Sequence, residues 1–167
     1  MQLVDKSELF VFNRESTRTG VIPYTYINGE PHWLMGLSVY DGLVEPRVVW
    51  SDFGGGCEIR KGERPIDCLL RETDEESSSV LTRVVEDAIV NDNPSVWKLY
   101  SRRGNLTGFF VLVEIPYDQY WRRFTPNEEV VALVWLPQSE VLSPEIAIEK
   151  FHQPIQRIVQ EFRDHCC

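Results

Sequence analysis

One short segment of the chain carries the charged side chains Arg71, Glu72, Glu75 and Glu76. At about 100° per residue on an α-helix, the three glutamates fall within one sector of the helix surface. Carboxylates at these spacings repel one another, and a bound cation would offset that repulsion. Hard oxygen ligands suit Mg²⁺, with Mn²⁺ as a substitute. The glutamates therefore predict a divalent-cation site, and the alternative is a solvated acidic surface.

The carboxylates need a helix to bring them together, and the sequence supplies its start and its inner face. Proline suits a first helical position because its missing N–H would have no partner there, so we expect the helix to begin at Arg64 or Pro65. An apolar face lies beside the acidic one and consists of Ile66, Leu69, Leu70 and Thr73. That face predicts packing against a core.

Glycines occupy positions 54, 55 and 56, just before this helix. Glycine at 55 or 56 would let a main-chain carbonyl approach the cation without a Cβ in the way. Gly56 therefore joins Glu72, Glu75 and Glu76 as a predicted metal ligand. A loop turn alone would also explain the glycines.

The segment Gly54–Leu81, GGGCEIRKGERPIDCLLRETDEESSSVL, resembles the signature of the Nudix hydrolase superfamily. That signature is a glycine and a glutamate followed by Arg-Glu-apolar-x-Glu-Glu-x-Gly-apolar, and Glu63 precedes Arg71 by the interval that it requires. Flanking segments resemble the family's strands and extend the similarity over most of the chain. They are Gly20–Tyr24, Val48–Phe53 and Asn127–Trp135.

The segment departs from the signature at the loop and at the end of the helix. The loop between Gly56 and Glu63 holds one extra residue, and Thr73 stands where an aliphatic residue is usual. Ser78 replaces the glycine that normally ends the helix, and Ser79 takes the following apolar position. Because glycine adopts the left-handed cap most readily, we expect this helix to end differently. None of these departures removes a carboxylate.

The resemblance implies an α/β fold, a Nudix-type α/β/α sandwich with a mixed β-sheet between helices, in a single domain over residues 1–167. The residue patterns agree with it. Asn28-Gly29 between the strand-like segments Gly20–Ile27 and His32–Val39 predicts a tight hairpin. Val80–Val90 has helical periodicity, as a second helix or an extension of the first.

The remainder of the chain predicts further strands and a final helix. The strands are Trp97–Ser101, Gly108–Ile115 and Val130–Leu136. The helix is expected to start at Ser143-Pro144-Glu145 and to be kinked or divided by Pro154. Its inner face consists of Ile148, Phe151, Ile155, Ile158, Val159 and Phe162.

The expected chemistry is hydrolysis of a phosphoanhydride by water. Divalent ions on Glu72, Glu75 and Glu76 would neutralise charge and lower the pKa of the attacking water. The resemblance implies that Arg71 orients Glu63 or a signature carboxylate, although it could be a surface arginine. Glu75, Glu128 and Glu129 are candidates for the general base, with Glu76 in the catalytic set, and the two residues before the last strand are equally explained as solvated charges.

Candidate substrate-binding residues lie in basic pairs and on strands. Arg102 and Arg103 lie in a predicted hairpin, where they could hold phosphates or could be solvated loop charges. Trp50 and Tyr24 could stack on a base, whereas strand aromatics more often belong to the core. His152 is interpreted as a helix-surface or packing residue because nothing nearby in the sequence pairs with it.

The sequence therefore predicts a Mg²⁺-dependent Nudix pyrophosphohydrolase acting on a nucleoside diphosphate linked to another group. Diphosphoinositol polyphosphates and capped RNA are alternative substrates within the family. A catalytically weak nucleotide-binding regulatory module is an alternative of another class, since folds are reused for different functions. An acidic structural domain without a ligand is a third.

Composition sets limits on location and partners. The net charge of −9 disfavours broad binding to nucleic-acid backbones. No signal peptide or membrane span is recognised near the N-terminus, so a cytoplasmic protein without membrane contact is expected, and a homodimer would fit many relatives. Cys57, Cys68, Cys166 and Cys167 form a poor disulfide framework, so reduced thiols are expected. Lipidation of the terminal pair is an alternative.

Overall fold

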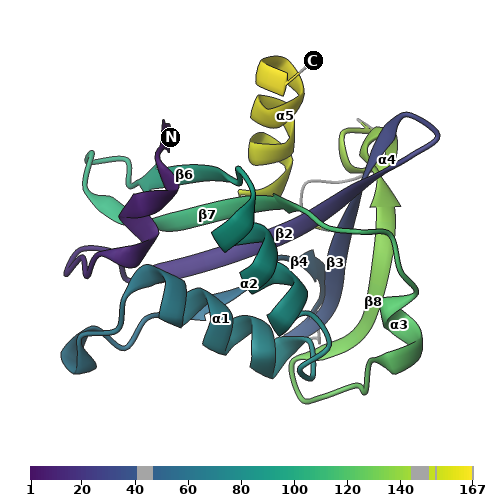
Figure 1. Cartoon of the computed structure of the whole chain (residues 1–167), viewed down its shortest axis with the longest axis horizontal. Coiled ribbons are helices and arrows are strands. Elements are labelled where there is room, and N and C mark those ends of the chain that lie inside the picture. Colours follow the sequence, from purple (N-terminus) through teal and green to yellow (C-terminus); the bar gives the residue numbers. More distant parts are fainter. Residues whose placement is uncertain (41–46, 144–150, 153, 167) are drawn as a thin grey trace.

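The computed structural model describes residues 1–40, 47–143, 151–152 and 154–166 (Figure 1). Its strands are β1 (Gln2–Val4), β2 (Arg18–Ile27), β3 (Glu30–Tyr40), β4 (Arg47–Ser51), β5 (Phe53–Gly56), β6 (Ser95–Tyr100), β7 (Leu106–Glu114) and β8 (Val130–Pro137). Its helices are α1 (Pro65–Glu76), α2 (Thr82–Asn91), α3 (Tyr120–Arg123), α4 (Gln138–Val141) and α5 (Ile155–Cys166), with 3₁₀ turns η1 (Lys6–Phe10) and η2 (Ile59–Lys61).

The strands form one mixed sheet in the order β1-β6-β7-β2-β3-β4, to which β5 adds on β2 and β8 adds on β3. Among the named strands of the described chain, β2 and β7 run parallel and the other pairs are antiparallel. Helices α1 and α2 cover one face of the sheet and α5 covers the other (Figure 1). The expected α/β/α sandwich is confirmed.

Two hydrophobic clusters hold these layers together. One lies between the sheet and the α1–α2 pair, with Leu69, Val85 and Phe109 fully or almost fully buried. The other lies under α5, where Phe162 packs against Trp33 and Tyr24. Both clusters use alternate residues of the same central strands, as expected for a sheet that is covered on both faces.

Local sequence signals were reliable guides to the element boundaries. Helix α1 begins at Pro65 with Arg64 as its N-cap, as predicted. The β2–β3 hairpin turns through Asn28 and Gly29, both at positive φ, which is the geometry that Asn-Gly favours. Val80–Val90 forms a separate helix, α2.

The final helix is shorter than predicted over the described residues. Helix α5 begins at Ile155, directly after Pro154, consistent with the restriction that proline places on a helix interior. Phe151 pairs with Trp50 as an isolated bridge. The predicted helix start at Pro144-Glu145 and the inner residue Ile148 lie outside the described residues.

A division in the sheet positions the candidate site. Strands β2 and β3 pair with each other near their hairpin, from Tyr24–Trp33 to Ile27–Glu30. Beyond that, β2 pairs with β5 and β3 pairs with β4, so the chain crosses from one strand to the other between Ser51 and Phe53. We call this crossing the strand fork; Asp52 lies at it.

Candidate active site

Three glutamates meet in a cavity of about 540 Å³ beside the strand fork, where Asp52 is a fourth carboxylate in the lining. Glu72 and Glu76 reach it from α1, and Glu129 reaches it from the loop before β8. The full lining is Arg18, Ser38, Val39, Ser51, Asp52, Gly54, Gly55, Gly56, Glu72, Glu76, Glu129 and His152. A larger cavity of about 640 Å³ between α3 and β8 is lined mainly by apolar side chains and holds none of these carboxylates.

Arg71 organises the start of this site through its guanidinium. Its Nε donates to Glu63 Oε1 at 2.8 Å, and its terminal nitrogens donate to Glu72 Oε1 at 2.7 Å and to the Gly56 carbonyl at 2.9 Å. The hydrogen bond to Glu63 is the main reason that the pKa of Arg71 is raised, and it lowers the pKa of Glu63 in turn. Arg71 therefore holds the glycine loop, Glu63 and Glu72 in one arrangement.

Glu72, Glu76 and Glu129 form what we call the acidic wall of the cavity, and its negative charge is only partly compensated. Burial raises the pKa of Glu76 to about 9, and the charges of Asp52, Glu129 and Glu72 act in the same direction. Burial also raises the pKa of Glu72, against the opposing effect of Arg71. The main-chain N–H of Gly54 donates to Glu76 Oε2 at 3.4 Å, a long contact. Such a wall would gain from a bound cation.

The glycine loop fits against this wall because it lacks side chains. A Cβ on Gly55 would overlap the carboxylate of Glu72. The loop therefore needs glycine at this position for close approach, whatever the backbone conformation.

Solved structures of similar overall fold provide the comparison. An Ap4A hydrolase from C. elegans is 16% identical, over 89% of this chain and 97% of its own, with a TM-score of 0.55. The Nudix domain of NrtR from Shewanella oneidensis, complexed with ADP ribose, is 14% identical over 93% and 91%, with a TM-score of 0.54. A Nudix hydrolase from Nitrosomonas europaea is 13% identical over 89% of each chain, with a TM-score of 0.51.

The chain has the Nudix fold. The searches of family models and of curated proteins gave no significant match. We refer to α1 as the Nudix helix from here on.

The Nudix helix ends through serine where the family signature has glycine. Ser78 and Ser79 both adopt positive φ, at 51° and 66°, so the left-handed cap forms without glycine. Ser78 Oγ donates to the Thr125 carbonyl at 2.5 Å and accepts from the Asn127 side chain at 3.2 Å. These contacts offset part of the conformational cost. Thr73, at the usual aliphatic position, is buried and donates to the Leu69 carbonyl.

The other predicted site residues are not brought to the cavity in the described structure. Glu75 points to solvent with 59% of its side chain exposed, at 3.7 Å from Arg71. Arg102 and Arg103 are exposed at the tip of the β6–β7 hairpin. Tyr24 and Trp50 pack into the cluster under α5, because their strand positions face that layer.

The sequence did not indicate that Arg18 and Asp52 line the cavity, and it gave His152 no role there. Asp52 is fully buried and accepts hydrogen bonds from Arg18 at 2.9 and 3.2 Å. Its Oδ1 also lies 3.2 Å from His152 Nδ1. The predicted helical position of His152 is wrong, since it precedes α5, and its side chain lines the cavity. Only the pairing of distant strands brings these residues together, so no local signal could find them.

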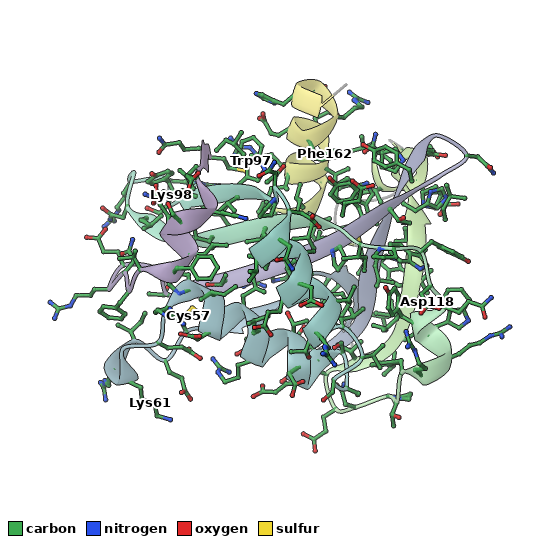
Figure 2. All side chains as sticks on the ribbon, viewed as in Figure 1. Cys57, Lys61, Trp97, Lys98, Asp118 and Phe162 are labelled. Atoms are coloured by element: carbon green, nitrogen blue, oxygen red, sulfur yellow. A yellow bond between two sulfur atoms is a disulfide. The ribbon has the colours of Figure 1, made fainter. Side chains whose placement is uncertain are left out.

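The expectation of reduced thiols at Cys57 and Cys68 is also wrong, because the structure joins them in a disulfide (Figure 2). Cys57 follows the glycine loop and Cys68 lies on the Nudix helix. Packing of that loop against the helix brings the sulfurs together, and sequence spacing gave no sign of it. Cys167 lies outside the described residues. None of the helices in the described part of the chain is both long and apolar enough to cross a membrane.

Proposed function

We propose that this protein is a Mg²⁺-dependent hydrolase that cleaves a phosphoanhydride bond, in a nucleoside diphosphate linked to another group. The observation that carries the proposal is the convergence of Glu72, Glu76 and Glu129 on one cavity beside a glycine loop. The similarity to an Ap4A hydrolase and to an ADP-ribose complex supports a nucleotide diphosphate as the substrate class.

The donor set fits a hard divalent cation. Glu72 and Glu76 supply carboxylate oxygens within a cavity where burial and neighbouring carboxylates raise their pKa values. Mg²⁺ favours this ligand chemistry, and Mn²⁺ would substitute. The Gly56 carbonyl, which the sequence predicted as a metal ligand, accepts a hydrogen bond from Arg71. At Gly55 an added Cβ would overlap the Glu72 carboxylate.

The chain's own residues divide the remaining work. Bound Mg²⁺ would screen the diphosphate charge and acidify water. Arg71 keeps Glu72 and Glu63 in position through its hydrogen bonds. Glu129 lines the cavity from a different loop, so we assign it to take the proton from the water that attacks phosphorus. Glu75 lies on the exposed side of the helix, so we assign it only an ion pair with Arg71.

The test is a mass-spectrometric screen of the purified protein with Mg²⁺. The compounds are nucleoside diphosphate derivatives, diphosphoinositol polyphosphates and capped RNA. Wild type is compared with Glu76→Gln and with the control Glu86→Gln, which alters an exposed glutamate of α2. The proposal is supported if wild type and the control cleave a compound and Glu76→Gln cleaves it about a thousandfold more slowly.

Binding is followed separately by thermal denaturation with and without Mg²⁺. Intact substrates throughout, together with a melting temperature that rises with nucleotide, would replace the hydrolase with a nucleotide-binding module. Equal cleavage by wild type and Glu76→Gln would rule out this carboxylate as part of the machinery.

A further inference from the structure

Asp52 is an unusual residue to find at the strand fork. Its side chain has no exposed surface, and a Cβ on Gly20 would overlap its carboxylate, so the neighbouring strand leaves room for it. An isolated buried carboxylate is costly unless it is paired. We therefore expect neighbouring side chains to compensate the charge of Asp52.

The two partners of Asp52 are a guanidinium and an imidazole, from opposite ends of the chain. Arg18 at the start of β2 approaches both carboxylate oxygens, at 3.2 and 2.9 Å, and His152 approaches one of them at 3.2 Å. Burial by itself would raise the pKa of Asp52, but the charge of Arg18 and the contact with His152 outweigh it and lower the pKa. Asp52 thus stays ionised and acts as a fixed anchor for two basic side chains.

Both basic side chains also line the cavity that holds the acidic wall. Arg18 and His152 are each about one third exposed, at 31% and 34%, whereas their anchor is fully buried. The hydroxyls of Ser38 and Ser51 lie 2.6 Å apart, and both residues also line the cavity. The cavity therefore has an acidic wall, formed by Glu72 and Glu76 of the Nudix helix with Glu129, and hydrogen-bond donors at the strand fork.

The guanidinium of Arg18 offers hydrogen-bond donors and no ligand atom for a cation, which suits a phosphate. A guanidinium binds phosphate oxygens through paired N–H donors. We propose that Arg18 and His152 bind a phosphate group of the substrate beyond the diphosphate that is cleaved, and that Asp52 positions both. This inference rests on the proposed function and narrows it to substrates with at least one additional phosphate, such as nucleoside triphosphates or dinucleoside polyphosphates.

The competing explanation is that Arg18 and His152 only neutralise a buried carboxylate. In that role the two residues would stabilise the folded protein but would not discriminate between ligands. A measurement of ligand selectivity therefore separates the two explanations, whereas a measurement of stability alone does not.

The experiment is calorimetric titration of the full chain with Mg²⁺ present, using imidodiphosphate and diimidotriphosphate. These probes differ by one phosphate, and the bridging NH groups block hydrolysis. We expect wild type to bind the longer probe about tenfold more tightly. Arg18→Lys and His152→Asn should each reduce that preference by several fold, with the shorter probe little affected.

Asp52→Asn tests the positioning role, because it keeps the size of the side chain and removes the charge. It should lower the preference while Arg18 and His152 are intact. Arg83→Met, which removes an exposed charge from α2, is the matched control and should keep the wild-type ratio. Melting curves of each variant identify any that fail to fold, and Arg18→Lys guards against that outcome because it keeps a positive charge beside Asp52.

Equal affinity of wild type for the two probes would overturn the inference, as would a preference that survives in Arg18→Lys and His152→Asn. The probes are not hydrolysed, so the outcome does not depend on turnover. A protein that prefers the longer probe but cleaves nothing would overturn the hydrolase and leave the phosphate site standing.

Discussion

The side-chain amide of Asn127 donates a hydrogen bond to the main-chain carbonyl of Glu76 at 3.0 Å. The same nitrogen lies 3.3 Å from the Glu75 carbonyl, so it satisfies acceptors at the end of the Nudix helix that have no partner within the helix. Its Oδ1 accepts from the main-chain nitrogens of Glu129 and Val130 at 3.0 and 2.9 Å. One side chain therefore links the end of the Nudix helix, which carries Glu75 and Glu76, to the loop that carries Glu129.

Replacing Asn127 with alanine should reduce both stability and activity. It leaves several main-chain groups without their partner, so we expect a loss of about 1 to 3 kcal/mol in the free energy of unfolding. Because Glu129 would be misplaced, kcat should fall by about tenfold or more with a smaller change in KM. Urea denaturation and steady-state kinetics measure these effects. Asn91→Ala, at the exposed end of α2, is the control; equal effects in both variants would refute the linkage.

Ser79→Gly should stabilise the protein. Ser79 is exposed and has φ of 66°, which glycine adopts without strain. We expect a gain of about 0.5 to 1 kcal/mol in the free energy of unfolding, measured by chemical denaturation.

Ser78→Gly provides the comparison for that variant. It relieves similar strain but removes the hydroxyl that contacts Thr125 and Asn127, so the two effects should nearly cancel. A larger gain at Ser78 than at Ser79 would show that those hydrogen bonds contribute little.

Without divalent cations, Glu76 should make the protein less stable as pH rises. The folded-state pKa of about 9 lies above the ordinary 4.5, so between these values the folded protein holds a proton that the unfolded chain has released. The contribution is present below about pH 4.5 and is lost progressively up to about pH 9. Denaturation midpoints in a chelator should therefore fall over this window.

Glu76→Gln should flatten that decline and stabilise the protein at pH 8 by on the order of 2 kcal/mol. Added Mg²⁺ should raise the melting temperature of wild type more at pH 8 than at pH 6, because binding must displace the proton. Glu86→Gln should retain the wild-type slope. A stability that is independent of pH in wild type would mean that Glu76 is ionised throughout.

Breaking the bond between Cys57 and Cys68 should destabilise the fold. The bond closes a loop with a sequence separation of 11, for which chain entropy gives about 2 to 3 kcal/mol. Cys68→Ser and chemical reduction should lower the free energy of unfolding by similar amounts. Peptide mapping after alkylation checks the premise, since labelling of Cys57 in the unreduced protein would show that the bond is absent.

Much of the fold could be predicted because its signals are local. Pro65 marks the start of the Nudix helix, and Asn28-Gly29 marks the hairpin, through conformational preferences that act over a few residues. Glu72 and Glu76 could be assigned to one site because helical spacing alone places them on one side.

The parts that could not be predicted depend on contacts between distant segments. Arg18, Asp52 and His152 meet through strand register, and register is not visible in any one strand. Tyr24 and Trp50 had the right chemistry for stacking on a base, but the alternation of each strand turns them toward α5. Glu75 shares a broad sector with its neighbours, yet it lies about 100° around the helix from Glu76 and its side chain is 59% exposed.

The strand fork has a mechanical consequence for how the protein meets its ligand. Both sides of the fork are hydrogen-bonded strands, β5 on β2 and β4 on β3, so that wall of the cavity moves only if sheet pairing is broken. Deformation of a paired sheet is far more costly than movement of a loop. This wall of the cavity is therefore rigid. We expect ligands whose shape does not match it to bind weakly, because the wall does not adjust around them.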